Sequence, residues 1–354
     1  MERARPPGPH PFSDGLRRGS GNLPGVNLLV TGAAGFVGSA YVRMMLADAR
    51  EPQITVLDKL TYAANPANLA IGHPRLRFVQ GDIRDAELVD KLMSEADQIV
   101  HFAAESHVDR SIEGAEDFVL TNVLGTQVLL DAALQHGVGP FVHVSTDEVY
   151  GSIATGSWPE DHPVQPNSPY SASKASSDLF ALAYHRTHGL DVRVTRCSNT
   201  YGPRQFPEKI IPLFVTHLLD GRKVPLYGDG SNVREWLHVE DHCRGVELVR
   251  TRGRAGEIYN IGGGTELTNR ELTELLLAAC GAGWDSVEHV RDRKGHDLRY
   301  SVDCRKAREE LGYRPRQDFR RGLEATVAWY RENRDWWEPL KARAKLRTQI
   351  QAVR

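Results

Sequence analysis

Short apolar runs alternate with amphipathic stretches over roughly the first 200 residues of the chain. The runs are apolar on both faces, which is typical of strands that helices cover on both sides. Alternation of this kind requires crossover connections and therefore predicts a parallel sheet. The predicted strands are 27–31, 54–58, 77–80, 98–103, 141–146 and 191–197, and the predicted helices between them are 36–48, 85–95, 121–136 and 171–188.

The pattern loosens after residue 200, where prolines and glycines interrupt it. A helix over 240–250 and a strand over 257–261 return to the earlier pattern, and helices over 268–280, 303–311 and 319–333 follow. We therefore predict an α/β fold: a Rossmann-type doubly wound parallel sheet with a smaller C-terminal substrate-binding domain. The predicted boundaries are 26–199 plus 236–264 for the main domain and 200–235 plus 265–340 for the smaller one, with a flexible extension over 1–25 and a tail over 341–354.

Composition narrows the class of protein. The chain has 354 residues and a formal net charge of -2, which argues against nucleic-acid and membrane partners. Its four cysteines (Cys197, Cys243, Cys280, Cys304) form no ligand cluster, so we expect reduced thiols, no metal site and a cytoplasmic protein. We expect no secretory signal in 1–25 and no run near the ~20 apolar residues that a membrane span needs.

A glycine-rich turn follows the first predicted strand and opens a helix. Its glycines, Gly32, Gly35 and Gly38, permit a tight turn and a close backbone approach to a pyrophosphate. The helix N-terminus then offers free N–H groups to the phosphates. Asp58 ends the next strand, where a carboxylate can accept both ribose hydroxyls of NAD and repel the 2′-phosphate of NADP. Asp82, after the third strand, is placed to touch the adenine, although a turn aspartate is the alternative.

Tyr170 and Lys174 are spaced i, i+4, so they share one face of a predicted helix. The ammonium, together with the nicotinamide charge, is expected to lower the pKa of the phenol from about 10 and make it a base for a sugar hydroxyl. A buried tyrosine and a solvated lysine are the alternative, because this spacing is common by chance. Ser145 and Thr146, at the end of the preceding strand, favour the catalytic interpretation.

Asp147 and Glu148 stand at the C-terminal edge of a predicted strand, where ligands bind in open α/β sheets. An isolated pair of this kind is more often a turn acid and a helix cap. In a chain that binds NAD, two carboxylates in different environments can divide into an acid and a base. One can then protonate a leaving hydroxyl while the other removes a carbon-bound proton.

Nine segments resemble the extended short-chain dehydrogenase/reductases, and more narrowly the dTDP-glucose 4,6-dehydratase family. They are TGAAGFVGS (31–39), LDKLTYAAN (57–65), GDI (81–83), HFAAESHVDRSI (101–112), STDEVYG (145–151), YSASK (170–174), FPEKIIPL (206–213), LYGDGSNVREWLHVEDH (226–242) and GHDLRY (295–300). The resemblance covers about residues 26–340 and implies NAD as cofactor and dTDP-glucose as substrate.

The resemblance also implies roles for particular residues. Catalysis would fall to Thr146, Asp147, Glu148, Tyr170 and Lys174, with Glu148 taking the C5 proton and Asp147 protonating the C6 hydroxyl. The residues in contact with NAD would be Gly32, Gly35, Phe36, Val37, Gly38, Asp58, Lys59, Thr61, Asp82, Ile83, Phe102, Ala103, Ala104, Ser106, Thr121, Tyr170 and Lys174. The substrate would contact Ser106, Thr146, Asn199, Lys209, Pro225, Tyr227, Arg234, Asn269, His296 and Tyr300, whereas His107 and Arg110 would be structural.

The chain departs from the family pattern at Thr200 and Arg204, where the run NTYGPR is reminiscent of UDP-glucuronate decarboxylases. A UDP-glucose 4,6-dehydratase, an epimerase or a decarboxylase therefore remain alternatives, although Asp147 argues against the last two. A nucleotide-binding protein without activity is a further alternative, which the complete catalytic set disfavours. The resemblance implies a homodimer through helices near 115–135 and 170–188, whose apolar stripes could equally be core (Val119, Val123, Val128, Leu129; Leu179, Leu182, Ala183).

Overall fold

The structure is a computed structural model that describes residues 25–47 and 52–351. The predicted N-terminal extension therefore lies outside the described residues, except for Gly25.

A seven-stranded sheet forms the centre of the molecule, and all its neighbouring strands are parallel. The strand order is β10-β6-β5-β4-β1-β2-β3. The strands are β1 (Val26–Thr31), β2 (Pro52–Asp58), β3 (Leu76–Gln80), β4 (Gln98–His101), β5 (Phe141–Thr146), β6 (Val192–Cys197) and β10 (Ile258–Ile261). The order reverses between β1 and β4, which is where an open parallel sheet leaves a crevice for a ligand. The predicted fold class is confirmed.

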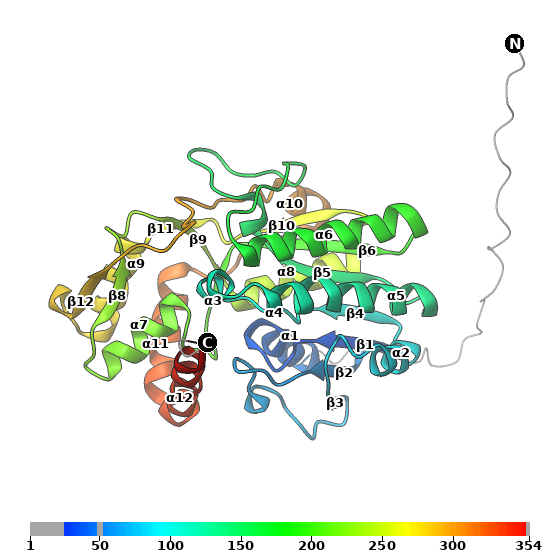
Figure 1. The fold of residues 1–354 in the computed structure, drawn as a ribbon, viewed down its shortest axis with the longest axis horizontal. Coiled ribbons are helices and arrows are strands. Elements are labelled where there is room, and N and C mark those ends of the chain that lie inside the picture. The colour runs from blue at the N-terminus through cyan, green and yellow to red at the C-terminus, as the bar shows by residue number, and fades with distance from the viewer. Residues whose placement is uncertain (1–24, 48–51, 352–354) are drawn as a thin grey trace, which may run out of the picture.

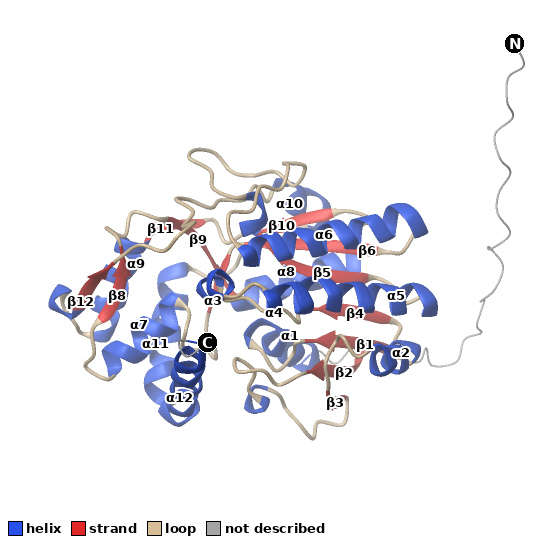
Figure 2. Ribbon diagram, viewed as in Figure 1, coloured by secondary structure: helices blue, strands red, loops and turns tan. Residues whose placement is uncertain are grey.

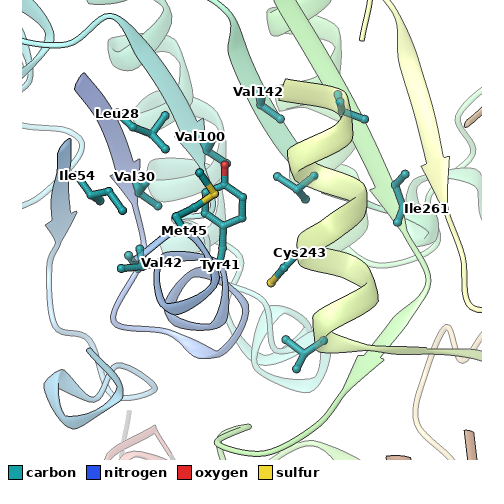
Figure 3. Close-up of a cluster of buried hydrophobic side chains, with 14 of the residues drawn as sticks. Leu28, Val30, Tyr41, Val42, Met45, Ile54, Val100, Val142, Cys243 and Ile261 are labelled. Carbon is teal, nitrogen blue, oxygen red and sulfur yellow. The ribbon is translucent and has the colours of Figure 1, made fainter. Parts of the chain in front are cut away.

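Helices cover both faces of this sheet (Figure 2). Alternate residues of β1 face opposite sides, so Leu28 and Val30 join one core and Leu29 joins the other. The first core packs against α1 (Phe36–Ala47), α8 (Val239–Arg252) and α10 (Arg305–Leu311), as Figure 3 shows for α1 and α8. The second core packs against α2 (Ala86–Ser94), α5 (Thr126–His136) and α6 (Pro169–His188). These are the double-sided layers that the apolar runs predict.

A smaller assembly lies beyond the carboxyl ends of the strands (Figure 1). Its sheets are β11-β9-β7 and β12-β8, formed by β7 (Asn199–Tyr201), β8 (Val224–Tyr227), β9 (Val233–His238), β11 (Thr265–Thr268) and β12 (Val287–Val290). Its helices are α7 (Ile210–Leu219), α9 (Asn269–Cys280), α11 (Phe319–Glu332) and α12 (Arg334–Gln351). A third core, with Phe214, Trp236 and Trp337 among its largest side chains, holds these elements together.

The helical stretch Glu116–His136 is long and apolar enough to cross a membrane by length and composition. This corrects the expectation that no run approaches that length. The stretch joins α4 (Glu116–Phe118), a π-helical segment (Val119–Gly125) and α5. Leu129, Leu130 and Ala133 are fully buried in the second core, and a core helix of a water-soluble fold passes the same test of length and composition.

Candidate active site

One cavity of about 700 Å³ lies between the carboxyl ends of the central strands and the smaller assembly. Every residue predicted to act in catalysis, cofactor binding or substrate binding lines it. The described residues contain no group of three or more His, Cys, Asp or Glu side chains that could hold a metal ion. The cavity therefore brings together the three predicted sets of residues, whose individual roles stay predictions at this point.

The glycine-rich turn is built so tightly that side chains are excluded from it. Gly32 has φ of +71°, and a Cβ there would lie 2.5 Å from the backbone of Ala103. A Cβ on Gly38 would lie 2.6 Å from the carbonyl oxygen of Gly32. Helix α1 begins at Phe36, so its free N–H groups open toward the cavity that Phe36, Val37 and Gly38 line. This cradle fits a dinucleotide pyrophosphate.

Asp58 ends β2 beside this turn. Its Oδ2 accepts a hydrogen bond from the Ala34 amide at 2.8 Å, and its Oδ1 accepts one from the Leu60 amide at 2.8 Å. Burial raises the pKa of Asp58, while these two hydrogen bonds lower it. Leu60 has φ of +58°, which is rare for a residue with a branched side chain and holds the next turn close to the carboxylate. The remaining lone pairs of Asp58 are available to a ligand in the cavity.

The Lys59 ammonium and the Asp82 carboxylate form an ion pair of 2.8 Å just after the carboxyl end of β3. Burial alone would raise the pKa of Asp82, but hydrogen bonds from Arg84 and Lys59 lower it well below its usual value. Asp82 is therefore a paired carboxylate as well as part of the cavity wall. Its predicted contact with the adenine stays a prediction.

Tyr170 and Lys174 lie in the first turns of α6, which Ser168 caps through a capping box. The Lys174 Nζ is buried and donates a hydrogen bond to the carbonyl oxygen of Val144 at 2.9 Å. The pKa of Tyr170 is raised well above its usual value, by burial first and then by Glu148, whereas a hydrogen bond from Thr146 lowers it. In the protein chain alone, burial and Glu148 therefore dominate this pKa. The predicted lowering, which includes the nicotinamide charge, stays a prediction.

Asp147 and Glu148 follow β5 in a single 3₁₀ turn that Thr146 caps by accepting a hydrogen bond from the Glu148 amide at 3.2 Å. Burial raises the pKa of Asp147 well above its usual value, and the nearby carboxylates of Glu148 and Glu235 raise it further. Asp147 Oδ2 is buried and has no hydrogen-bond partner among the described residues. Burial and these two neighbouring carboxylates therefore favour the protonated form of Asp147, against smaller opposing effects of Arg234 and Thr146.

Glu148 has more cations around it than Asp147 has. Burial raises the pKa of Glu148, and Asp297 adds to this, whereas Arg293, Lys209 and Arg234 lower it, so that the pKa is raised but not as strongly as that of Asp147. Two adjacent carboxyl groups whose surroundings differ in this way can divide into a proton donor and a proton acceptor.

Arg234 projects from β9 into the part of the cavity that the smaller assembly supplies. Its guanidinium lies 4.3 Å from the ring centroid of Tyr300 and donates to the carbonyl oxygen of Asp297 at 3.0 Å. Asn269, the first residue of α9, also lines this part of the cavity. A buried, fixed guanidinium beside a helix N-terminus suits a phosphate group.

Glu208 joins three segments around the cavity. It accepts hydrogen bonds from Tyr62 at 2.8 Å and from Arg110 at 3.1 Å, and His107 Nε2 lies 3.9 Å away. The neighbouring Lys209 Nζ donates to the Ser106 carbonyl oxygen at 2.6 Å. These contacts to Glu208 are consistent with the structural role predicted for His107 and Arg110.

Sequence reasoning missed Glu235 and Arg293, which shift the pKa values of Asp147 and Glu148, and Glu208, which pairs with Arg110. No local pattern marks them, because each acts on groups that are distant along the chain. At the two departures from the family pattern, Thr200 lines the cavity and its Oγ1 lies 3.0 Å from His242 Nδ1. Arg204 is outside the cavity wall and has φ of +69°.

The parallel sheet with its glycine turn, together with the Tyr170–Lys174 pair at the same cavity, defines an extended short-chain dehydrogenase/reductase. Residues 29–326 match the family profile described as GDP-mannose 4,6 dehydratase. The chain is 72% identical to the dTDP-glucose 4,6-dehydratase of Streptomyces antibioticus over 90% of this chain and 96% of that protein. The chain belongs to this family of nucleotide-sugar dehydratases, and within it to the dTDP-glucose 4,6-dehydratases.

Solved structures agree with this assignment. DesIV, a dTDP-glucose 4,6-dehydratase from Streptomyces venezuelae crystallised with NAD and TYD bound, is 66% identical with a TM-score of 0.88, covering 89% of this chain and 100% of that chain. A UDP-glucose 4-epimerase from Thermotoga maritima is similar in fold, with 32% identity and a TM-score of 0.81 over 87% of this chain and 99% of that chain. Because the fold is shared with an epimerase, the reaction must be argued from the site.

Proposed function

We propose that the protein converts dTDP-glucose to dTDP-4-keto-6-deoxyglucose with NAD as a cofactor that each cycle regenerates. The observation that carries this proposal is that Asp147 and Glu148 line the same cavity as Tyr170 and Lys174, with Asp147 Oδ2 buried and without a hydrogen-bond partner among the described residues. The pKa of Asp147 is raised more strongly than that of Glu148, which favours Asp147 as the acid. An epimerase or a decarboxylase has no leaving hydroxyl that would need the acid.

The residues of the cavity fit NAD. The turn at Gly32 and Gly38 leaves room only for backbone, and Asp58 stands at the end of the neighbouring strand with lone pairs free for the ribose hydroxyls. The carboxylate of Asp58 disfavours the 2′-phosphate of NADP. When bound, NAD accepts a hydride from C4 of the sugar and returns it to C6.

Tyr170 removes the proton of the C4 hydroxyl in the first step, and Thr146 hydrogen-bonds at the same oxygen. Lys174 supplies positive charge behind the phenol from its buried position on the same face of α6. The nicotinamide charge adds to it, which offsets the effect of burial and Glu148 on the phenol.

The 4-ketone acidifies the proton on C5. Glu148 removes that proton, and Asp147 donates its proton to the departing C6 hydroxyl, which leaves as water. The two carboxyl groups thereby exchange protonation states during elimination. General acid and base catalysis of this kind contributes about 10²- to 10⁴-fold each.

The smaller assembly holds the nucleotide. Arg234 and Asn269 bind the diphosphate, while Ser106 and Asn199 contact the sugar and the adjoining phosphate. Lys209, Pro225, Tyr227, His296 and Tyr300 surround the nucleoside, and all of them line the cavity.

A homodimer is part of the proposal. Among the described residues, large hydrophobic side chains are exposed at few positions, and Val119, Leu124, Leu179 and Phe180 lie on the adjoining segment Val119–Gly125 and helix α6. Other members of the predicted stripes, Leu129 and Leu182, are buried in the core. Helices of two copies would cover the exposed set. Cytoplasmic localisation stays a prediction, in keeping with four free cysteines.

A substrate comparison tests the proposed function. Purified protein is incubated, without added NAD, with dTDP-glucose, UDP-glucose or UDP-glucuronate in separate reactions. We expect a 4-keto product from dTDP-glucose, which absorbs near-ultraviolet light after alkali treatment. No product from dTDP-glucose, with turnover of UDP-glucuronate instead, would refute the proposal.

A further inference from the structure

A group of fully buried ionisable side chains lies behind the wall of the active-site cavity, between α6 and the strands β5 and β6. Asp178 is one turn beyond Lys174 on α6, and neither side chain is more than 3% exposed. Arg196 Nε on β6 donates to Asp178 Oδ2 at 2.9 Å, and His143 Nε2 on β5 lies 3.3 Å from Asp178 Oδ1. Asp178, His143 and Arg196 are absent from the lining of the cavity, so none of them reaches the substrate.

Burying ionised groups is costly, and apolar side chains of similar size are often at least as stable in such positions. A structural explanation alone therefore accounts poorly for a buried carboxylate at this place. Because Asp178 does not line the cavity, it can affect the reaction only through a neighbouring residue that does. Two such neighbours line the cavity: Ser145, which lowers the pKa of Asp178, and Lys174, at i, i-4 on the same face of the helix. Of these two, Lys174 carries a charge that a carboxylate can support.

Lys174 has few groups around it that can support its charge. Burial lowers its pKa to about 8, and Asp178 is the first of the charged groups that oppose this effect. His101 on β4 and His143 on β5 both have a pKa lowered by burial, so they are uncharged at neutral pH. Cys197 on β6 has a pKa raised to about 12 by burial and is a neutral thiol. Asp178, one turn away on α6, is thus the ionised acid among the groups that raise the pKa of Lys174.

Asp178 itself is kept ionised. Burial alone would raise its pKa, but Arg196 and the imidazole of His143 lower it to about 2. The Arg196 guanidinium extends away toward Tyr150, whose ring centroid is 4.6 Å from its central carbon. Oδ2 of Asp178 thus accepts from Arg196, while Oδ1 has His143 Nε2 at 3.3 Å.

We propose that Asp178 is a positioning residue for the reaction, whose buried carboxylate keeps the Lys174 ammonium charged. The proposal rests on the proposed function, because it assumes that Tyr170 needs this charge to act as the base. Tyr170, Lys174 and Asp178 would then stand at i, i+4 and i+8 on α6, each supporting the residue before it. Arg196 would hold Asp178 in place.

The test is the pH dependence of kcat in Asp178→Asn, compared with the wild type. Without the carboxylate the charged form of Lys174 is lost at lower pH, so the alkaline limb of kcat moves down by at least one pH unit. At pH 8 we expect kcat to fall at least tenfold while KM for dTDP-glucose changes by less than about twofold, and at pH 6 part of the deficit to be recovered. An unchanged alkaline limb would overturn the proposal.

The double variant Asp178→Asn with Arg196→Met separates charge support from simple pairing. It removes the buried guanidinium that the single variant leaves without its carboxylate, so it carries the test if the single variant does not fold. We expect it to keep the shifted alkaline limb. Recovery of the wild-type profile in the double variant would show that Asp178 serves only to pair Arg196. Absence of dTDP-glucose turnover by the wild type would refute the proposed function. An unchanged pH profile in the variants would refute only the part given to Asp178, so the two outcomes can be told apart.

Discussion

The amide nitrogen of Ala34, in the glycine-rich turn, donates a hydrogen bond of 2.8 Å to Oδ2 of Asp58 at the end of the neighbouring strand. This bond fixes the carboxylate beside the turn that would receive the pyrophosphate. The same side chain thus organises the turn and is the proposed acceptor for the ribose hydroxyls.

Asp58→Asn keeps the size of this side chain but removes its charge. A hydrogen bond to a charged group contributes about 1.5–3 kcal/mol, so we expect NAD affinity to fall about 10- to 100-fold. Affinity for NADP should fall less or rise, because repulsion of the 2′-phosphate is lost. Calorimetric titration of cofactor-free protein with both cofactors checks this, and an equal loss for the two would contradict the assigned role.

Asp147→Asn separates the two halves of the proposed reaction. The amide cannot donate the proton to the departing hydroxyl, so dehydration should slow by about 10²-fold or more while oxidation at C4 continues. Rapid mixing that follows NADH absorbance should show it accumulating in the variant. Glu148→Gln, at the adjacent position, is the matched comparison for loss of the base. Equal slowing of oxidation and dehydration in Asp147→Asn would be evidence against the acid.

The same carboxyl group makes stability depend on pH. Its pKa is raised in the folded protein, above about 3.9 when unfolded, so the folded state holds a proton that the unfolded state releases. Its contribution to stability is complete below about pH 4 and is lost as the pH rises toward the folded pKa. The Tm of Asp147→Asn minus that of the wild type should therefore grow between pH 4 and pH 7. Asp131→Asn, at an exposed position, is the control. A difference that stays constant with pH would show that the group is not held protonated.

Phe180→Asp tests the proposed dimer. Phe180 is 41% exposed on α6 beside Leu179, and a charge there would be buried between two copies. We expect this variant to sediment as a monomer at concentrations where the wild type is a dimer. Ile71→Asp, at a side chain 56% exposed on a turn before β3, should leave the assembly unchanged. A dimer that survives Phe180→Asp would exclude this surface.

The sequence predicts the central sheet well because parallel strands buried on both faces are continuous apolar runs. Strand β5 coincides with the predicted 141–146, and β4 ends earlier than predicted because the chain turns after His101 to approach Gly32. The smaller assembly is harder to predict from the sequence, since strands such as β7 and β11 are too short to show a hydrophobic period. Helix α12 was not predicted; it carries Pro339 within a largely polar stretch.

The positions of the proposed catalytic side chains can be predicted because they lie in local sequence patterns, whereas their protonation states cannot. The adjacent acids Asp147 and Glu148 are visible in the sequence, but Glu235 and Arg293, which push their pKa values in different directions, come from other elements. The burial that raises the pKa of Tyr170 in the protein chain alone is equally invisible in the sequence, because burial depends on the whole fold.

Transfer of a deuterium label within one sugar tests the central claim most directly. The protein is incubated with dTDP-glucose carrying deuterium at C4, and the product is examined by mass spectrometry and NMR. We predict dTDP-4-keto-6-deoxyglucose with the deuterium at C6, since the hydride leaves C4 and returns to C6 in the same active site. A product without deuterium at C6, or no 4-keto product at all, would contradict the account.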